Sequence, residues 1–245
     1  MTHARARIST TVRLVKLLLR RPLMVLTKRD WRGAERLPAD GGFVLAANHV
    51  SHLDPIMLSH WMLDHGITPH FLAKEGLFRV KPLVGRVVGS AEQIPVYRRT
   101  DRARDAFDAA VDAVERGWVV SFYPEGTITR DPDLWPMTGH TGAVRVALRT
   151  GAPLVPVAQW GPQDILWPYT KRPHFFPRRT YRVLVGPPVD LSDLAGRPLE
   201  ESVLREGTQR MMAAITDLLA ELRGERPTRP PIDAHTVGDQ HRRSA

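Results

Sequence analysis

A histidine and an aspartate five residues apart form the most reactive combination in the sequence. His49 and Asp54 lie in segment 48–54, Asn-His-Val-Ser-His-Leu-Asp, directly after the apolar run Phe43–Ala47. A titratable imidazole oriented by a carboxylate is the minimal unit of general-base catalysis. In such a pair His49 takes a proton from a substrate hydroxyl, while Asp54 fixes the imidazole tautomer and stabilises the imidazolium.

The residues around this pair place it at the end of a strand. The run Phe43–Ala47 predicts a buried strand, and Asp54-Pro55 predicts the start of a helix. Asp54 is expected to be its N-cap, with Pro55 at the first helical position. His49 then lies at the C-terminal end of the strand, where open α/β sheets bind ligands. A polar loop histidine and a plain helix cap would explain the same residues without chemistry.

His52 leaves a second interpretation of the segment open. With His49 and Asp54 it offers two imidazoles and a carboxylate, which are common zinc ligands. A metal-dependent hydrolase is therefore an alternative function. The other histidines are scattered and no second ordered cluster of His and Asp follows, so we expect no metal.

Composition limits the class of protein and the kind of partner. A chain of 245 residues with 42% hydrophobic and 25% charged residues is long enough for one well-buried α/β domain. The net charge of +9 predicts an anionic partner. No nucleic-acid-binding motif is visible, so an acidic membrane surface and phosphorylated substrates are favoured. The absence of cysteine excludes disulfides, a thiol nucleophile and thiolate metal ligands.

The two ends of the chain differ from its middle. Residues 1–30 are both basic and apolar, but their apolar stretches are shorter than the roughly 18 residues of a spanning helix. They predict an amphipathic helical segment in the membrane interface, and a helix packed on the sheet with solvated basic residues is the alternative. Residues 225–245 are polar and Pro-rich, which predicts a disordered tail. The catalytic domain is then expected at residues 31–224.

Between these ends, short apolar strands alternate with helices. Strands are expected at 69–74, 92–96, 118–123, 154–159 and 180–185, and helices at 56–63, 101–116, 142–150 and 199–223. Near-continuous apolar strands alternating with helices predict an α/β fold, with a mostly parallel, mixed central sheet flanked by helices.

Two further segments place polar residues at predicted strand ends, and a third is wholly apolar. Arg98 follows the strand at 92–96 and suits a bidentate phosphate contact. Pro124 ends the next strand, where Glu125 follows and Gly126 lets a ligand approach the backbone closely. Val155–Ala158 offers no acid–base group, so we assign it to packing. An exposed arginine and an ordinary turn would explain the first two segments equally well.

Taken in order, four blocks resemble those of the glycerolipid acyltransferases. They are Asn48–Asp54 (the NHxxxxD block), Gln93–Arg98, Phe122–Thr127 and Val155–Ala158. The chain is similar to the bacterial, PlsC-like 1-acylglycerol-3-phosphate acyltransferases over roughly its middle 200 residues. It departs from the third block because Ile128 stands where arginine often follows the threonine, and Arg130 comes two positions later.

The resemblance implies acyl transfer from a thioester donor, acyl-CoA or acyl carrier protein, to the hydroxyl of 1-acylglycerol-3-phosphate. The product is phosphatidate, and no cofactor other than the thioester co-substrate is implied. His49 and Asp54 would be catalytic, and backbone amides at the strand end would bind the oxyanion. The implied substrate-binding residues are Asn48, Lys74, Arg98, Glu125, Gly126, Thr127 and Arg130.

Within that set the resemblance implies distinct roles. Arg98 would neutralise the phosphate with Lys74 or Arg130 as helpers, and Glu125 and Gly126 would position the glycerol. The implied partners are a lysophosphatidate-like acceptor, the thioester donor and an anionic membrane surface, with no nucleic acid. The implied location is peripheral or monotopic, on the cytoplasmic face of the cell membrane. Another lysophospholipid or glycolipid acceptor and a non-enzymatic lipid-binding protein are the alternatives.

Overall fold

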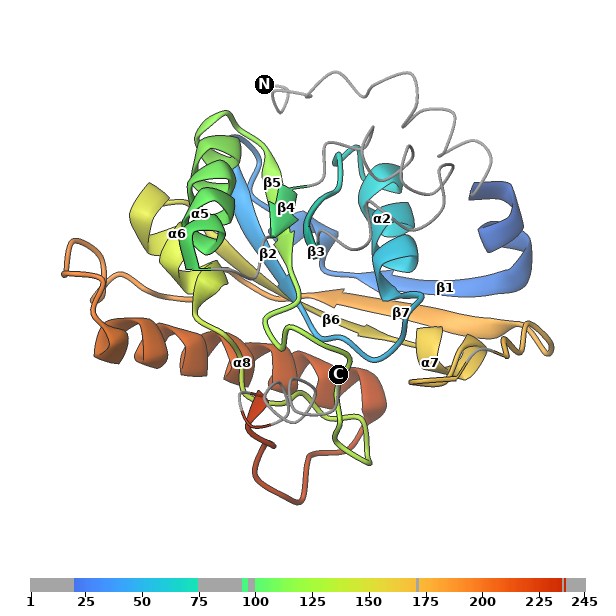
Figure 1. The fold of residues 1–245 in the computed structure, drawn as a ribbon. Coiled ribbons are helices and arrows are strands. Elements are labelled where there is room, and N and C mark those ends of the chain that lie inside the picture. Colours follow the sequence, from blue (N-terminus) through green and yellow to red (C-terminus); the bar gives the residue numbers. More distant parts are fainter. Residues whose placement is uncertain (1–19, 75–93, 97–99, 171, 235, 237–245) are drawn as a thin grey trace.

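The computed structural model describes residues 20–74, 94–96, 100–170, 172–234 and 236, and it shows a sheet covered by helices on both faces (Figure 1). The strands are β1 (Thr27–Arg32), β2 (Phe43–Ala47), β3 (His70–Lys74), β4 (Ile94–Val96), β5 (Val119–Phe122), β6 (Leu154–Trp160) and β7 (Arg179–Val185). The helices are η1 (Ala34–Arg36), α2 (Asp54–Asp64), α5 (Thr100–Glu115), α6 (Gly142–Thr150), α7 (Pro162–Ile165) and α8 (Glu201–Arg223).

The seven strands lie in the order β1-β7-β6-β2-β5-β3-β4. Neighbours are parallel throughout except for the antiparallel pair β6–β7. Strand β2 is central, with β5 on one side and β6 on the other, both parallel to it. The C-terminal ends of these three strands therefore meet at one edge of the sheet, and the chain that follows β2 emerges there.

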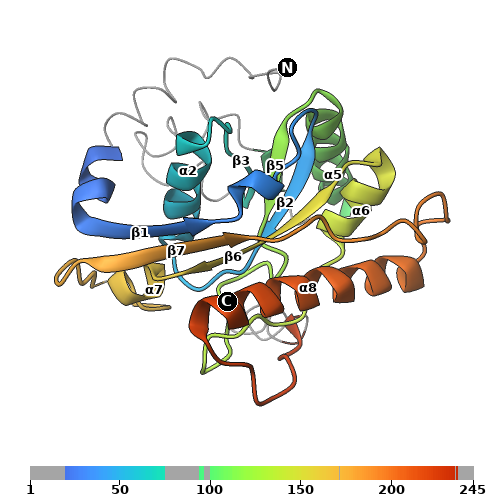
Figure 2. The same ribbon diagram turned by 180° about the vertical axis from the view of Figure 1, so that it is seen from behind.

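The side chains of β2 divide the core into two layers. Phe43, Leu45 and Ala47 pack against α2, whereas Val44 and Ala46 face α5, α6 and α8. All five side chains are at most 1% exposed. Figures 1 and 2 show the same division, with α2 on one face and α8 along the other. A strand buried on both faces needs the continuous apolar run that the sequence has.

This architecture confirms the predicted fold class, a mostly parallel, mixed sheet flanked by helices. The predicted strand at 43–47 and helix at 142–150 have the observed bounds. The other predicted strands and helices that fall in the described residues agree with the structure to within about two residues.

The prediction of an amphipathic helical segment over residues 1–30 is wrong for residues 27–30. Residues 20–26 are helical, but Thr27–Arg32 forms β1, which pairs in parallel with β7. This strand is charged and its burial is irregular, because it joins the edge of the sheet through backbone hydrogen bonds and not through an apolar face. Residues 1–19 lie outside the described residues. In the part of the chain that the structure does describe, no helix is both long and apolar enough to cross a bilayer.

The prediction of a disordered tail over residues 225–245 is wrong for residues 225–234. The Thr138 N–H donates to the Ile232 carbonyl at 2.9 Å, and the Ala234 N–H donates to Thr138 Oγ1 at 2.9 Å. Ala234 is 1% exposed. Backbone contacts, one small buried side chain and ion pairs of Arg226 with Asp217 and Arg229 with Asp133 hold this polar segment, a pattern that composition does not reveal. The predicted tail from residue 237 onward lies outside the described residues.

Candidate active site

The predicted histidine–aspartate pair forms at the C-terminal end of β2. His49 Nδ1 lies 2.8 Å from Asp54 Oδ2. The Asp54 carboxylate is fully buried, and the His49 side chain keeps 15% of its surface exposed. The pair thus has one shielded member and one that a substrate can reach.

The prediction that Asp54 caps the helix is wrong. Leu53 is the N-cap of α2, no side chain caps the helix, and Asp54 is its first residue. Asp54 Oδ2 instead accepts the backbone N–H groups of Val50, at 2.5 Å, and Ser51, at 2.8 Å. The carboxylate turns back toward the loop that precedes the helix, because three donors converge on one of its oxygens there. Asp54 therefore holds both the loop and the imidazole.

The contacts of His49 define its tautomer and the plane of its ring. An ionised carboxylate only accepts hydrogen bonds, so His49 Nδ1 carries the proton and Nε2 keeps its lone pair. The ring stacks on Tyr123, with centroids 4.3 Å apart and an interplanar angle of 24°. Tyr123 in turn stacks on Phe71 at 5.8 Å. An imidazole held in this way can accept a proton at Nε2 without first reorienting.

Glu125 supports the His49 backbone from the end of β5. Its Oε1 accepts the His49 N–H at 3.0 Å, and its Oε2 accepts the Met137 N–H at 3.0 Å. The residue is 1% exposed. The sequence predicts a glycerol-binding carboxylate here, whereas both carboxylate oxygens are engaged by the protein's own backbone. These contacts favour a positioning role, in which Glu125 joins the backbone at Met137 to the backbone at His49.

Burial raises the pKa of Glu125 to about 8, although the N–H groups of Met137 and His49 oppose the shift. The folded state therefore binds a proton that the unfolded chain releases near pH 4.5. Its stabilising contribution is fully present below about pH 4.5 and is lost as the pH rises through about 8. We expect the free energy of unfolding of the unaltered chain, relative to Glu125→Gln, to fall by up to about 1.4 kcal/mol per pH unit in this window.

Urea unfolding of both proteins at pH 5, 6.5 and 8 measures this difference. Glu115→Gln, the same substitution at an exposed position of α5, is the matched control and should show no such trend. A difference between the unaltered chain and Glu125→Gln that stays constant across the three pH values would contradict the assignment.

Asn48 ties the end of β2 to β6. Its Nδ2 donates to the Gln159 carbonyl at 3.0 Å, and its Oδ1 accepts the Gln159 N–H at 2.8 Å. Gln159 Nε2 returns a bond to the Asn48 carbonyl at 2.9 Å, and the Tyr181 hydroxyl donates to Gln159 Oε1 at 3.1 Å. Asn48 is 1% exposed, so its contacts fix the strand end on which His49 stands. Gln159 was not predicted to belong to the site, although a polar residue directly after the apolar segment 155–158 was an available signal.

The segment after Glu125 runs along the other side of the His49 loop. The Thr129 N–H donates to the His49 carbonyl at 2.8 Å. The Arg130 guanidinium lies over the Tyr169 ring, 3.7 Å from its centroid, and the Tyr169 hydroxyl donates to the Ile128 carbonyl at 2.5 Å. Gly126 has a φ of +69°, in the left-handed region that favours glycine. A Cβ at this position would also lie only 3.0 Å from the His140 ring. Arg130 is thus brought near the predicted site, two positions after the usual motif arginine.

Two predicted phosphate ligands cannot be placed. Arg98 lies outside the described residues, and of Lys74 only the backbone, at the end of β3, is described. Strands β3 and β4 continue the parallel part of the sheet beyond β5, so both end at the edge that carries His49.

Neither His52, which the metal alternative requires, nor the neighbouring Ser51 is placed to take part in catalysis. His52 is exposed, and its ring meets the Tyr169 ring edge-on at 6.3 Å. Among the residues that the structure describes, no three His, Cys, Asp or Glu side chains are placed to hold a metal ion together. Ser51 is fully buried, and its hydroxyl donates to the Leu166 carbonyl at 2.7 Å, so it is not presented as a nucleophile.

The oxyanion site predicted at the strand end is not formed by the nearest amides. The N–H of His49 binds Glu125, and the N–H groups of Val50 and Ser51 bind Asp54. These three donors stabilise the loop and are unavailable to a substrate.

Comparison with known proteins identifies the family of the chain. The sequence profile of the family described as Acyltransferase matches residues 28–160, more than half of the chain. A 1-acyl-sn-glycerol-3-phosphate acyltransferase of Bacillus subtilis is 30% identical over 167 residues, which cover 68% of this chain and 76% of that protein. The chain belongs to the acyltransferase family.

Other relatives carry the same activity in their names. The chloroplastic 1-acyl-sn-glycerol-3-phosphate acyltransferase BAT2 of Brassica napus is 33% identical over 141 residues, 57% of this chain. The match spans only 39% of the length of the Brassica protein. The crystal structure of the PlsC acyltransferase from Thermotoga maritima superposes with a TM-score of 0.63 and 23% identity, covering 88% of this acyltransferase and 81% of that chain. The fold is therefore shared.

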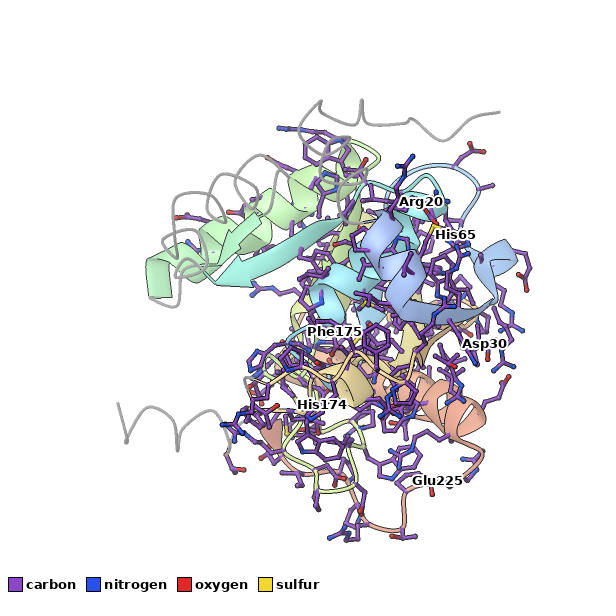
Figure 3. The ribbon with its side chains drawn as sticks, turned by 90° about the vertical axis from the view of Figure 1, so that its right-hand side faces the viewer. Arg20, Asp30, His65, His174, Phe175 and Glu225 are labelled. Atoms are coloured by element: carbon purple, nitrogen blue, oxygen red, sulfur yellow. The ribbon has the colours of Figure 1, made fainter. Side chains whose placement is uncertain are left out.

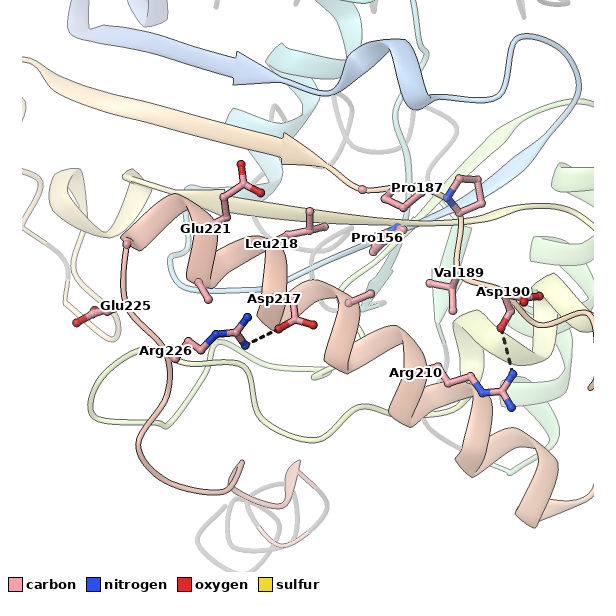
Figure 4. A pocket seen from close by; sticks show the side chains of 15 residues that line it. Pro156, Pro187, Val189, Asp190, Arg210, Asp217, Leu218, Glu221, Glu225 and Arg226 are labelled. Carbon is pink, nitrogen blue, oxygen red and sulfur yellow. Dashed lines mark hydrogen bonds and ion pairs between the residues drawn. The ribbon is translucent and has the colours of Figure 1, made fainter.

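A groove on another part of this acyltransferase contains none of the residues around His49. It has a volume of about 910 Å³ and runs along α8 beside the segment 186–190 (Figure 4). Its charged side chains are largely paired, Arg226 with Asp217 at 2.8 Å and Arg210 with Asp193. Its lining contains no histidine, so we place the candidate chemistry at His49.

Proposed function

We propose that the chain transfers a fatty acyl group from a thioester to the free hydroxyl of 1-acylglycerol-3-phosphate and so makes phosphatidate. The observation that carries this proposal is the contact of 2.8 Å between His49 Nδ1 and Asp54 Oδ2. That contact leaves Nε2 as a base on a partly exposed ring at the end of the central strand. Membership of the acyltransferase family and the names of the relatives support the reaction class.

In the proposed step, His49 Nε2 removes the proton of the acceptor hydroxyl as its oxygen attacks the thioester carbonyl. The new carbon–oxygen bond forms, the carbon–sulfur bond breaks, and the imidazolium returns its proton to the departing thiolate. Asp54 stabilises the imidazolium between the two proton transfers. The acceptor is itself the nucleophile, so no acyl-enzyme and no cofactor are needed.

The basic residues of the blocks supply the charge that the acceptor phosphate requires. We assign phosphate binding to Arg98 on its sequence position, with Arg130 and Lys74 as helpers. Arg130 is supported by its place over Tyr169, next to the segment bound to His49. Gly126 and Thr127 would line the path of the glycerol, and Asn48 and Glu125 would position the strand ends. The donor would be acyl-CoA or acyl carrier protein, at the cytoplasmic face of the membrane.

A panel of acceptors tests this assignment with one labelled acyl-CoA at a fixed detergent concentration. It contains 1-acylglycerol-3-phosphate, glycerol 3-phosphate, 1-acylglycerophosphocholine and 1-acylglycerol. We expect 1-acylglycerol-3-phosphate to have the highest kcat/KM, at least about tenfold above 1-acylglycerol, because arginine contacts to a phosphate are charge-assisted. Equal or faster acylation of 1-acylglycerol would contradict a phosphate-binding site.

A further inference from the structure

Aromatic side chains stand in solvent along the segment between α7 and β7. Trp167 is 52% exposed, Tyr169 44%, Phe175 40% and Phe176 75%. Residues 172–178 are exposed without interruption. We call residues 166–178 the aromatic loop. Large apolar side chains gain free energy when they leave water. Four exposed aromatic side chains in one loop therefore indicate a binding surface.

The aromatic loop is also strongly basic. Between Asp164 and Asp190 the sequence has no acidic residue, whereas residues 171, 172, 178 and 179 are all Lys or Arg. Segments that expose aromatic side chains beside Lys and Arg are typical of proteins that bind the headgroup region of a bilayer. Basic side chains add attraction to anionic lipids, and this falls off within a Debye length.

Contacts with the rest of the protein hold this surface in place. Arg178 donates to the carbonyls of Met24, at 2.9 Å, and Thr27, at 2.8 Å. The His174 N–H donates to the Ile165 carbonyl at 2.7 Å. The loop therefore lies beside the helical residues 20–26, in which Val25 is 67% exposed. Figure 3 looks onto this end of the molecule, where Arg20, His174 and Phe175 are labelled.

The same loop borders the candidate active site. Ser51 donates to the carbonyl of Leu166, the first residue of the loop. Tyr169 carries the Arg130 guanidinium on its face and the His52 ring at its edge. A lipid held at the aromatic loop would thus lie close to the loop that carries His49.

We propose that the aromatic loop docks onto an anionic bilayer, with Trp167, Phe175 and Phe176 entering the headgroup region and Arg172 contacting lipid phosphates. This contact is additional to any made by residues 1–30. It brings the acceptor lipid to the active site without the lipid leaving the membrane surface. The exposure and charge of the loop carry this proposal. It is tested by measuring vesicle binding, which does not depend on acyl transfer.

A site-specific probe gives the most direct test, because the chain has no cysteine. Phe176→Cys in the full chain introduces a single thiol, which is labelled with an environment-sensitive dye. Vesicles of phosphatidylglycerol and phosphatidylcholine should shift the emission of this dye to the blue. Arg149→Cys, on α6 at the other end of the sheet, is the control and should shift little. No shift at position 176 on vesicles that bind the chain would overturn the proposal.

Binding constants provide an independent measurement. We expect Phe175→Ser/Phe176→Ser to lower the vesicle partition coefficient of the full chain at least tenfold. Arg172→Glu should lower it about fivefold or more, and more steeply at low salt, whereas the charge-matched Arg149→Glu should change it less than twofold. Partitioning within twofold of the unaltered chain for the double variant would show that the loop does not dock. A change in oligomeric state without a change in partitioning would assign the surface to a second copy of the chain and overturn the proposal.

Discussion

Replacing His49 with alanine is expected to lower kcat for acyl transfer by about 10²–10⁴-fold, the usual contribution of a general base. The side chain is partly exposed at the end of β2, so its loss removes little of the core. The backbone bonds from the His49 N–H to Glu125 and from Thr129 to the His49 carbonyl do not depend on the imidazole. Steady-state kinetics with saturating thioester and acceptor, together with urea unfolding, would separate loss of chemistry from loss of fold.

His52→Ala is the matched control for this substitution. His52 lies three residues away, is exposed, and does not contact Asp54 in the described structure. We expect it to retain kcat within about threefold, because it takes no part in the proton transfer. Equal losses for His49→Ala and His52→Ala would contradict the single-base account and favour a metal-dependent hydrolase that needs both imidazoles.

Replacing Asp54 with asparagine removes the charge and can leave the geometry unchanged. All three donors that reach this carboxylate converge on Oδ2. The other oxygen, Oδ1, has no hydrogen-bond partner among the described residues. An asparagine with its carbonyl oxygen at the Oδ2 position therefore keeps every bond to His49, Val50 and Ser51. What it loses is stabilisation of the imidazolium, so we expect kcat to fall about 10–100-fold, as a charge-assisted bond is worth about 1.5–3 kcal/mol.

The measurement compares kcat and KM for Asp54→Asn with those for Asp108→Asn. Asp108 is exposed on α5 and serves as the matched control. The loss at Asp54 should appear in kcat, with KM for both substrates within about threefold, because the charge acts on the transition state. Near-normal kcat in Asp54→Asn would mean that Asp54 only holds the loop and takes no part in catalysis.

Elements with a strong apolar pattern were predictable from the sequence, and elements held by backbone contacts were not. The run Phe43–Ala47 predicted β2 because both of its faces are buried. Thr27–Arg32 reads as a charged segment, yet it forms β1, since an edge strand needs only a partner for its backbone. Residues 225–234 likewise read as a tail, although Ile232 and Ala234 bond to Thr138 and two arginines of the segment form ion pairs with Asp217 and Asp133.

The contact between His49 and Asp54 was predictable from the sequence, but the contacts of Asn48 and Glu125 were not. The spacing of His49 and Asp54 predicted their contact, which the structure shows. The direction of the Asp54 carboxylate, toward the preceding loop instead of the first helical turn, depends on local backbone geometry. Glu125 and Asn48 were predicted to bind substrate, but burial leaves their polar atoms facing backbone groups that no sequence pattern identifies.

Stoichiometry is the sharpest test of acyl transfer to a lipid hydroxyl through His49. Labelled acyl-CoA is mixed with the full chain in the presence of a chelator, with and without 1-acylglycerol-3-phosphate, and both the released thiol and the lipid product are quantified. We expect one thiol per phosphatidate, release only when the acceptor is present, and loss of both signals in His49→Ala. Thiol release without acceptor, or activity that the chelator abolishes, would contradict it.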